Sequence, residues 1–244
     1  MAVFDVVPNE NHPVYTSLSA ENLTRQYSFL KSIVLSSLGL GRPMLSTEAI
    51  LALNYHALAC LHSYAGVYRP CPVFIGPTGG PPTRTPPEHF RVPALMDLFV
   101  DEVNRNWELA DSLFLATYVL WKINYVHPFV NGNGRTARAA CLYVLCLKAG
   151  GWKFEQLPDL IKGNRPAYVS ALQHAHRTYE ATGQPDLSLL HALLAQLINS
   201  ILPPSAMPPA PPPQTQPTPP QGSQGGGAAS NPSTGATPGG PTQP

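Results

Sequence analysis

The run YVHPFVNGNGRTARAA, residues 125–140, separates two long apolar segments and decides how the rest of the chain is interpreted. Its neighbours, residues 108–126 and 136–149, are apolar nearly all round, which is typical of helices at the centre of a bundle. Two Asn-Gly pairs can indicate a β-hairpin, but a hairpin needs alternating strands on both sides, and both flanks here have helical periodicity. We therefore predict a polar loop between two buried helices. Such a loop must pair its backbone groups or present them to a ligand, and a plain helix–helix turn is the alternative.

Helical periodicity continues outward from this loop on both sides. It predicts five further helices, at residues 19–38, 46–66, 92–107, 165–182 and 186–202. A segment rich in Gly and Pro interrupts the series, and its one strand-like piece is Val73-Phe74-Ile75, for which we predict a small β-hairpin. The predicted fold class is all-α with this single hairpin.

Composition divides the chain into three parts. Residues 203–244 are rich in Pro and Gly and hold no charged or aromatic residue, so we predict a disordered tail. Residues 1–202 hold almost all the large apolar side chains, and we predict a domain at 20–202 after an N-terminal extension at 1–19.

The overall charge and hydropathy exclude several classes of partner. The formal net charge is +1 and only 12% of residues are charged, so we expect no nucleic-acid partner. No apolar run reaches membrane-spanning length, and the first residues do not form a secretory signal. We expect a cytoplasmic protein without membrane contact, and secretion as an effector is left open.

The loop residues favour binding of a polyphosphate. Gly132 and Gly134 allow backbone angles that other residues avoid, and free N–H groups at a helix start attract anions. Arg135 stands at that helix start, and Arg138 follows one turn later on the same face. His127, on the other side of the loop, can remove a proton from a hydroxyl at neutral pH. A base beside a phosphate site suggests group transfer from a nucleotide to a hydroxyl.

The segment His-Pro-Phe-Val-Asn-Gly-Asn-Gly-Arg, residues 127–135, resembles the signature of the Fic (Fic/Doc) family, HPFx[D/E]GN[G/K]R. The likeness extends over most of residues 20–202. It implies an α-helical Fic-like bundle with a β-hairpin flap. It also implies Mg²⁺- or Mn²⁺-dependent transfer of AMP from ATP to a Ser, Thr or Tyr hydroxyl of a target protein, with pyrophosphate leaving.

The resemblance also implies a role for each residue of the signature. His127 would be the general base, and Gly132, Asn133 and Gly134 would form the anion site, with the Asn133 side chain on the phosphates. Arg135 and Arg138 would hold the terminal phosphates. Val73, Phe74 and Ile75 would clamp the target segment by strand addition. The Gly-Asn-Gly-Arg ending favours AMP transfer over the kinase-like Doc branch.

Asn131 departs from the family pattern, which usually has a carboxylate at this position for the metal ion. An amide oxygen can still bind Mg²⁺, but without the attraction of a full negative charge, so weaker metal affinity is expected.

A possible regulatory pattern lies near the N-terminus, because Ser17, Glu21 and Asn22 fit the inhibitory pattern [S/T]xxxE[G/N] of many Fic proteins. In that pattern the glutamate pairs with the second arginine, here Arg138. Glu21 and Asn22 stand at the start of the first predicted helix with little chain before them, so we expect a chance match. An inhibitory partner chain is left open.

Two alternatives to AMP transfer stay open at this stage. One is a different Fic-type transfer of a nucleotide or phosphoryl group, or removal of AMP from a modified target. The other is a non-catalytic nucleotide-binding docking module, which Asn131 and the Pro-rich tail motivate.

Overall fold

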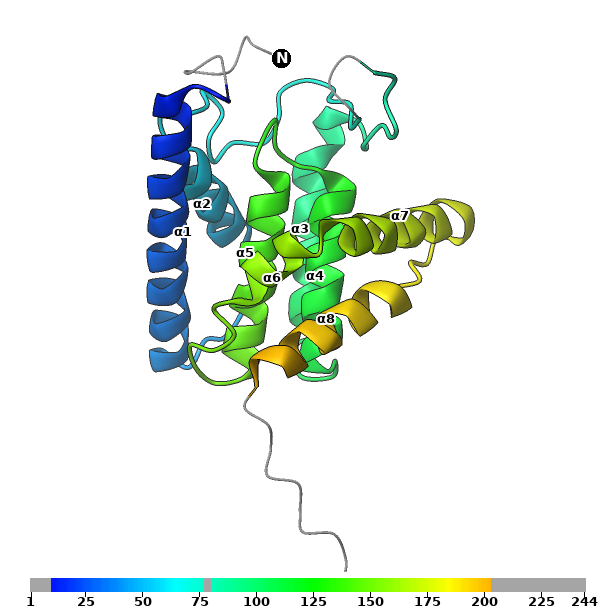
Figure 1. The fold of residues 1–244 in the computed structure, drawn as a ribbon. Helices are drawn as coiled ribbons and strands as arrows, with labels where there is room; N and C mark the ends of the chain where they lie inside the picture. Colours follow the sequence, from blue (N-terminus) through cyan, green and yellow to red (C-terminus); the bar gives the residue numbers. More distant parts are fainter. Residues whose placement is uncertain (1–9, 77–79, 203–244) are drawn as a thin grey trace, which may run out of the picture. The chain divides into compact units, whose positions relative to one another are not determined.

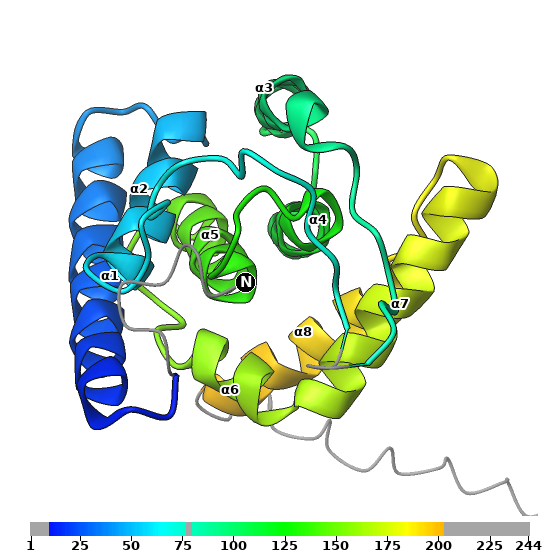
Figure 2. The same cartoon turned by 90° about the horizontal axis from the view of Figure 1, so that it is seen from above.

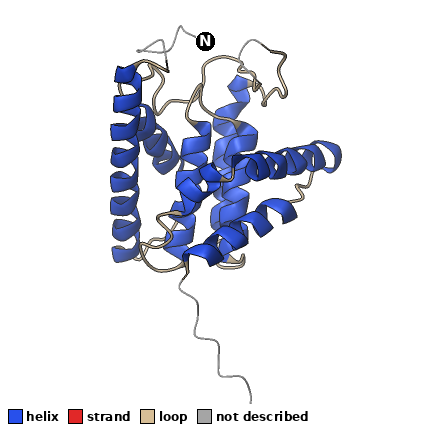
Figure 3. Cartoon of the chain, in the orientation of Figure 1, coloured by secondary structure: helices blue, strands red, loops and turns tan. Residues whose placement is uncertain are grey.

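The structure is a computed structural model that describes residues 10–76 and 80–202. The chain divides into two units, Met1–Pro203 and Pro204–Pro244, and the predicted disordered tail lies outside the described residues. The regular elements in the described part are helices, as Figures 1 and 3 show, and the predicted all-α class is confirmed. They are α1 (Pro13–Gly39), α2 (Thr47–Leu58), the short 3₁₀ helix η2 (His89–Arg91), α3 (Val92–Arg105), α4 (Ser112–Val126), α5 (Asn133–Lys148), α6 (Leu157–Gly163), α7 (Arg165–Thr182) and α8 (Ser188–Ile201).

Helices α4 and α5 form the centre of the domain, as their sequences predict. Figure 2 shows α1, α2, α3 and α6 to α8 arranged around them. The Asp111 side chain begins α4 by accepting hydrogen bonds from the backbone N–H groups of Leu113 and Phe114. Most residues of α5 are buried. The loop of residues 127–132 joins these two central helices, so it is anchored at both ends by the core.

Several predicted helix boundaries were wrong. Helix α1 begins at Pro13, not residue 19, because the His12 side chain caps it by accepting from the Val14 N–H. The predicted domain boundary at residue 20 therefore falls inside a helix. Helix α2 starts after the expected Ser46 cap, but it ends at Leu58 because Cys60 adopts a left-handed backbone with φ of 62°.

The predicted hairpin is reduced to one antiparallel bridge between Ile75 and Arg84, and the described residues contain no strand. The two backbones exchange N–H···O bonds of 3.0 and 3.1 Å. In this register the next hydrogen-bonding positions include Pro82 and Pro86, which have no N–H to donate. The ladder therefore stops after one pair.

None of the helices in the described ranges is long and apolar enough to cross a membrane.

Candidate active site

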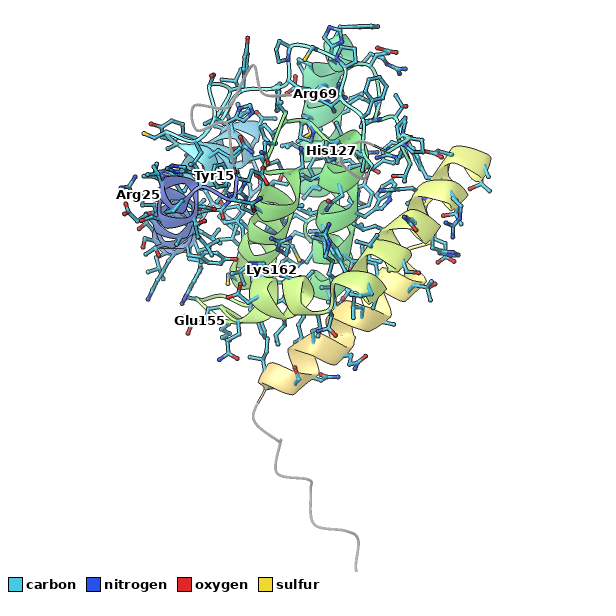
Figure 4. All side chains as sticks on the ribbon, turned by 45° about the horizontal axis from the view of Figure 1, so that its top comes forward. Tyr15, Arg25, Arg69, His127, Glu155 and Lys162 are labelled. Carbon is cyan, nitrogen blue, oxygen red and sulfur yellow. The ribbon has the colours of Figure 1, made fainter. Side chains whose placement is uncertain are left out.

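His127 ends α4 in a left-handed conformation, with φ of 52° and ψ of 57°. Its backbone N–H donates to the carbonyl of Ile123 at 2.9 Å, which closes the last turn of the helix. A left-handed non-glycine residue costs about 1–2 kcal/mol, so the surroundings must hold it in place. Figure 4 shows His127 at the end of the two central helices, with Arg69 nearby.

Arg69 is the first of the groups that hold His127. It is only 3% exposed, and its Nε donates to the His127 carbonyl oxygen at 2.8 Å. Its own backbone N–H donates to the Pro128 carbonyl at 2.9 Å. The guanidinium also donates to the carbonyls of Cys71 and Pro87. Arg69 thus joins the segment after α2 to the start of the loop.

Asn133 closes the loop from the other end. Its Oδ1 accepts from the Phe129 N–H at 2.9 Å, and its Nδ2 donates to the Phe129 carbonyl at 2.8 Å. Phe129 itself is fully buried. The Asn133 amide therefore fixes the loop shape, and the contact with phosphate that the resemblance implies stays a prediction.

Gly132 and Asn54 explain why the loop passes so close to α2. Gly132 has φ of 78°, and a Cβ there would lie 2.8 Å from Leu58 Cδ1. Asn54, fully buried on α2, donates to the Asn131 carbonyl and to Thr136 Oγ1, each at 3.1 Å. Its Oδ1 accepts from the Gly66 N–H at 2.9 Å. One amide side chain thus connects α2, the loop and α5.

A cavity of about 510 Å³ opens beside the loop, and His127, Gly134 and Arg138 all line it. The opposite wall comes from α7, including Tyr168 and His176. The structure therefore brings four of the predicted site residues, Ile75 among them, together around one space large enough for a small ligand.

Burial and nearby cations keep the His127 imidazole neutral. Burial, followed by the positive charges of Arg84 and Arg69, lowers the pKa of His127 to about 4. Its Nδ1 is enclosed and finds no hydrogen-bond partner in the described part of the chain. An unprotonated imidazole that lines a cavity can accept a proton from a ligand.

The two arginines of the predicted phosphate site face different surroundings. Arg138 lines the cavity and has no hydrogen bond or ion pair among the described residues, so its charge is available to an anion. A Cβ on Gly134 would lie 3.3 Å from Arg138 Nη1, so the glycine leaves room beside this guanidinium. Arg135 instead donates to Ser19 Oγ at 3.4 Å and to the Ala57 carbonyl at 3.2 Å. Its phosphate-binding role stays a prediction.

Both polar atoms of the Asn131 side-chain amide form hydrogen bonds within the chain. Its Oδ1 accepts from the Gly132 N–H at 2.6 Å, and its Nδ2 donates to Glu10 at 3.4 Å. Residues 10–76 and 80–202 contain no group of three or more His, Cys, Asp or Glu side chains placed to bind a metal ion. The metal role of Asn131 stays a prediction.

The pattern Ser17, Glu21 and Asn22 lies within α1. Glu21 pairs with Arg25 at 3.3 Å on an exposed face, with side-chain exposures near one half for both partners. Asn22 is buried and donates to the Ala59 carbonyl at 2.7 Å. Glu21 is thus paired with Arg25, whereas the resemblance would have placed it against Arg138.

The predicted target-docking residues divide by exposure. Ile75 lines the cavity, Val73 is buried, and Phe74 is 60% exposed. The three therefore reach both the cavity and the outer surface beside it.

Sequence reasoning gave no role to several residues that build this site. Asn54, Arg69, Arg84 and His176 act through buried contacts between elements far apart in the chain. The Pro-bounded Arg84 and the unremarkable Asn54 carry no local signal. Whether a polar residue of a helix is buried against another element can be recognised only in the packed structure.

Comparison with known proteins agrees with this geometry. Residues 44–145 match the Fic/DOC family, and this range includes the loop, α4 and most of α5. Over residues 44–145 the chain thus matches a Fic/DOC family domain. No curated protein sequence matches the chain.

Solved Fic structures share the fold. A fragment of Fic-1 from C. elegans superposes with a TM-score of 0.57 at 21% identity, covering 79% of this chain and 52% of that one. A Fic-domain signalling protein from Bacteroides thetaiotaomicron gives a TM-score of 0.52 at 21% identity, covering 74% of this chain and 66% of the other. A Fic family protein from Desulfovibrio desulfuricans gives 0.50 at 16% identity, covering 80% and 69%. This chain thus spans about half the length of the C. elegans fragment.

Proposed function

We propose that this domain transfers AMP from ATP to a Ser, Thr or Tyr hydroxyl of a target protein and releases pyrophosphate. One observation carries the proposal. A single cavity brings the neutral imidazole of His127 together with the start of α5 and the guanidinium of Arg138, which has no hydrogen bond or ion pair to the residues that the structure describes. The Fic/DOC family match over residues 44–145 supports the same interpretation.

Each part of the cavity has a role in this reaction. The target hydroxyl oxygen forms a bond to the α-phosphorus of ATP, and its proton passes to the neutral imidazole of His127. The bond between the α-phosphorus and the bridging oxygen breaks, and pyrophosphate leaves with that electron pair. Arg138 and the N-terminus of α5 stabilise the phosphate charge, which is the main demand of such transfers.

The target segment is proposed to lie along Val73, Phe74 and Ile75. Phe74 is exposed beside the cavity, so it can contact an extended segment whose hydroxyl reaches toward His127. Strand addition at this edge would use backbone groups and demand little of the target sequence.

We propose that a divalent cation enters as part of the substrate, as Mg·ATP or Mn·ATP. Such ions are commonly held by few protein groups together with substrate phosphates.

The test uses purified full chain, Mg²⁺ or Mn²⁺, and ATP labelled at either the α- or the γ-phosphate, with the chain itself and a cell lysate as targets. We expect covalent α-label, and we expect His127→Ala to lower it by about 100-fold or more while ATP binding persists. The matched control is His174→Ala, because His174 lies on the exposed side of α7 and pairs with Asp186 at 2.8 Å.

Other outcomes point elsewhere. Covalent γ-label alone would indicate phosphoryl transfer, and loss of AMP from a modified target would indicate hydrolytic removal of AMP. ATP binding without any label would favour the non-catalytic docking module.

A further inference from the structure

Arg84 is the point where the loop carrying Ile75 meets the helix that ends at His127. Its backbone forms the only described antiparallel bridge, with Ile75, so its main chain is fixed across the loop. Its Nη2 donates to the Tyr125 carbonyl at 2.8 Å, and its Nη1 donates to the Asn124 carbonyl at 3.4 Å. Both carbonyls belong to the last turn of α4, directly before His127.

The same guanidinium makes two further contacts. It lies 4.4 Å from the centre of the Tyr125 ring, over which it stacks. Its Nε lies 3.6 Å from a carboxylate oxygen of Glu180 on α7. The Arg84 side chain is only 13% exposed. One side chain therefore holds the flap loop, the end of α4 and α7 in a fixed relation.

Arg84 differs from Arg138, although both line the cavity. The Arg84 charge is matched by Glu180 and by two carbonyls at the negative end of a helix. Arg138 has no such partner in the described residues. The contacts of Arg84 are thus internal, whereas Arg138 is left for a ligand.

We propose that Arg84 is a positioning residue. It keeps the flap segment, defined here as Val73–Ile75, at a fixed position relative to His127. Its planar fork donates to two carbonyls while it stacks on a ring and pairs with a carboxylate. A lysine has one compact ammonium and cannot reproduce this set. The inference rests on the proposed transfer function, because a target hydroxyl bound along the flap segment can reach His127 only if the two are held at a fixed distance.

The first test compares Arg84→Lys and Arg84→Met with the parent chain, and uses Arg25→Lys as the control. Arg25 also pairs with a glutamate, but on an exposed face of α1. We expect both Arg84 variants to lower kcat by about 10- to 100-fold while the Kd for Mg·ATP changes less than threefold, since small misplacements of reacting groups have effects of this size. Arg25→Lys should leave both values unchanged.

The second test does not depend on transfer. Amide hydrogen exchange should accelerate at Ile75 and Arg84 in both variants, because the bridge loses its anchor on α4. Titration of His127 by NMR should separate charge from geometry. Its pKa should rise in Arg84→Met, which removes the cation, and stay low in Arg84→Lys, which keeps it.

Either of two results would overturn the proposal. Unchanged exchange at Ile75 and Arg84 would show that the side chain does not hold the flap. A large loss of Mg·ATP affinity with an unchanged kcat would make Arg84 a ligand-binding cation. If the parent chain transfers no label but exchange accelerates as expected, the transfer function fails and the anchoring role stands.

Discussion

Gly132 meets two independent demands at a single position. Its φ of 78° favours glycine, and a Cβ would lie 2.8 Å from Leu58 Cδ1 and 3.0 Å from Asn54 Nδ2. The Asn-Gly pairs in the sequence already indicated that the backbone here adopts a conformation that favours glycine. The steric demand could not be foreseen, because it depends on how closely α2 approaches the loop.

Gly132→Ala should therefore destabilise the domain more than an ordinary left-handed glycine would. Gly183, which ends α7 with φ of 76°, provides a matched control, because a Cβ added there would meet no atom within 4 Å. We expect Gly183→Ala to cost about 1 kcal/mol of unfolding free energy, and Gly132→Ala to cost about 1–3 kcal/mol more because of overpacking. Urea denaturation measures both, and equal losses would show that α2 yields without cost.

The titration of His127 gives a second prediction for a single side chain. Because its pKa lies at about 4, the imidazole should stay unprotonated down to about pH 5 in the free protein. NMR of ¹³C-labelled histidine, with His127→Ala to assign the signal, would follow the titration. A midpoint near 6.5, the ordinary value for histidine, would mean that the imidazole is hydrated and not enclosed.

Among elements, the contact of α2 with the loop depends on Asn54. Its amide bonds to the Asn131 carbonyl, Thr136 Oγ1 and the Gly66 N–H, all far from it in the chain. A buried amide with three partners is a strong constraint on how α2 is placed.

Asn54→Ala should lower the unfolding free energy by about 2–4 kcal/mol, because it leaves buried backbone groups unpaired and opens a small cavity. Asn106→Ala is the control, since Asn106 is exposed and its side chain bonds only to the Glu102 carbonyl one turn earlier. Urea unfolding of both variants, with hydrogen exchange at the Gly66 amide, is the measurement. A loss in Asn54→Ala no larger than in the control would show that packing alone places α2.

The predictability of the elements follows their length and periodicity. The two central helices were predicted because their apolar periodicity is unbroken, and the loop between them because its glycines and asparagines are local signals. Helix α6 was missed, since seven residues with Pro158 near the start give too short a pattern. The β-hairpin was overestimated, because the apolar run Val73–Ile75 does not show that prolines face it across the loop. The cavity walls from α7 depended on tertiary packing.

For the molecule as a whole, two buried histidines make stability depend on pH. Burial lowers the pKa of His176 to about 3, and its Nδ1 accepts from Trp121 Nε1 at 3.1 Å. Both His176 and His127 are therefore neutral in the folded chain at pH values where the same histidines bind protons in the unfolded chain.

The unfolding free energy should therefore fall as pH decreases from about 6.5 toward about 4, by up to about 1.4 kcal/mol per pH unit for each histidine. Urea unfolding at pH 7, 6 and 5 measures this slope. His176→Gln keeps an acceptor for Trp121 and removes one titrating group, so its slope should be smaller. An unchanged slope would assign the pH dependence to other groups.

The single bridge between Ile75 and Arg84 has a consequence for solubility. An open strand edge can recruit the same edge of another copy, and prolines are one way in which proteins prevent this. Because Pro82 and Pro86 interrupt the ladder on either side of Arg84, the pairing stays limited to one bridge, and the edge open to another copy is short. The chain can thus display an exposed Phe74 beside its cavity without making that surface a seed for aggregation.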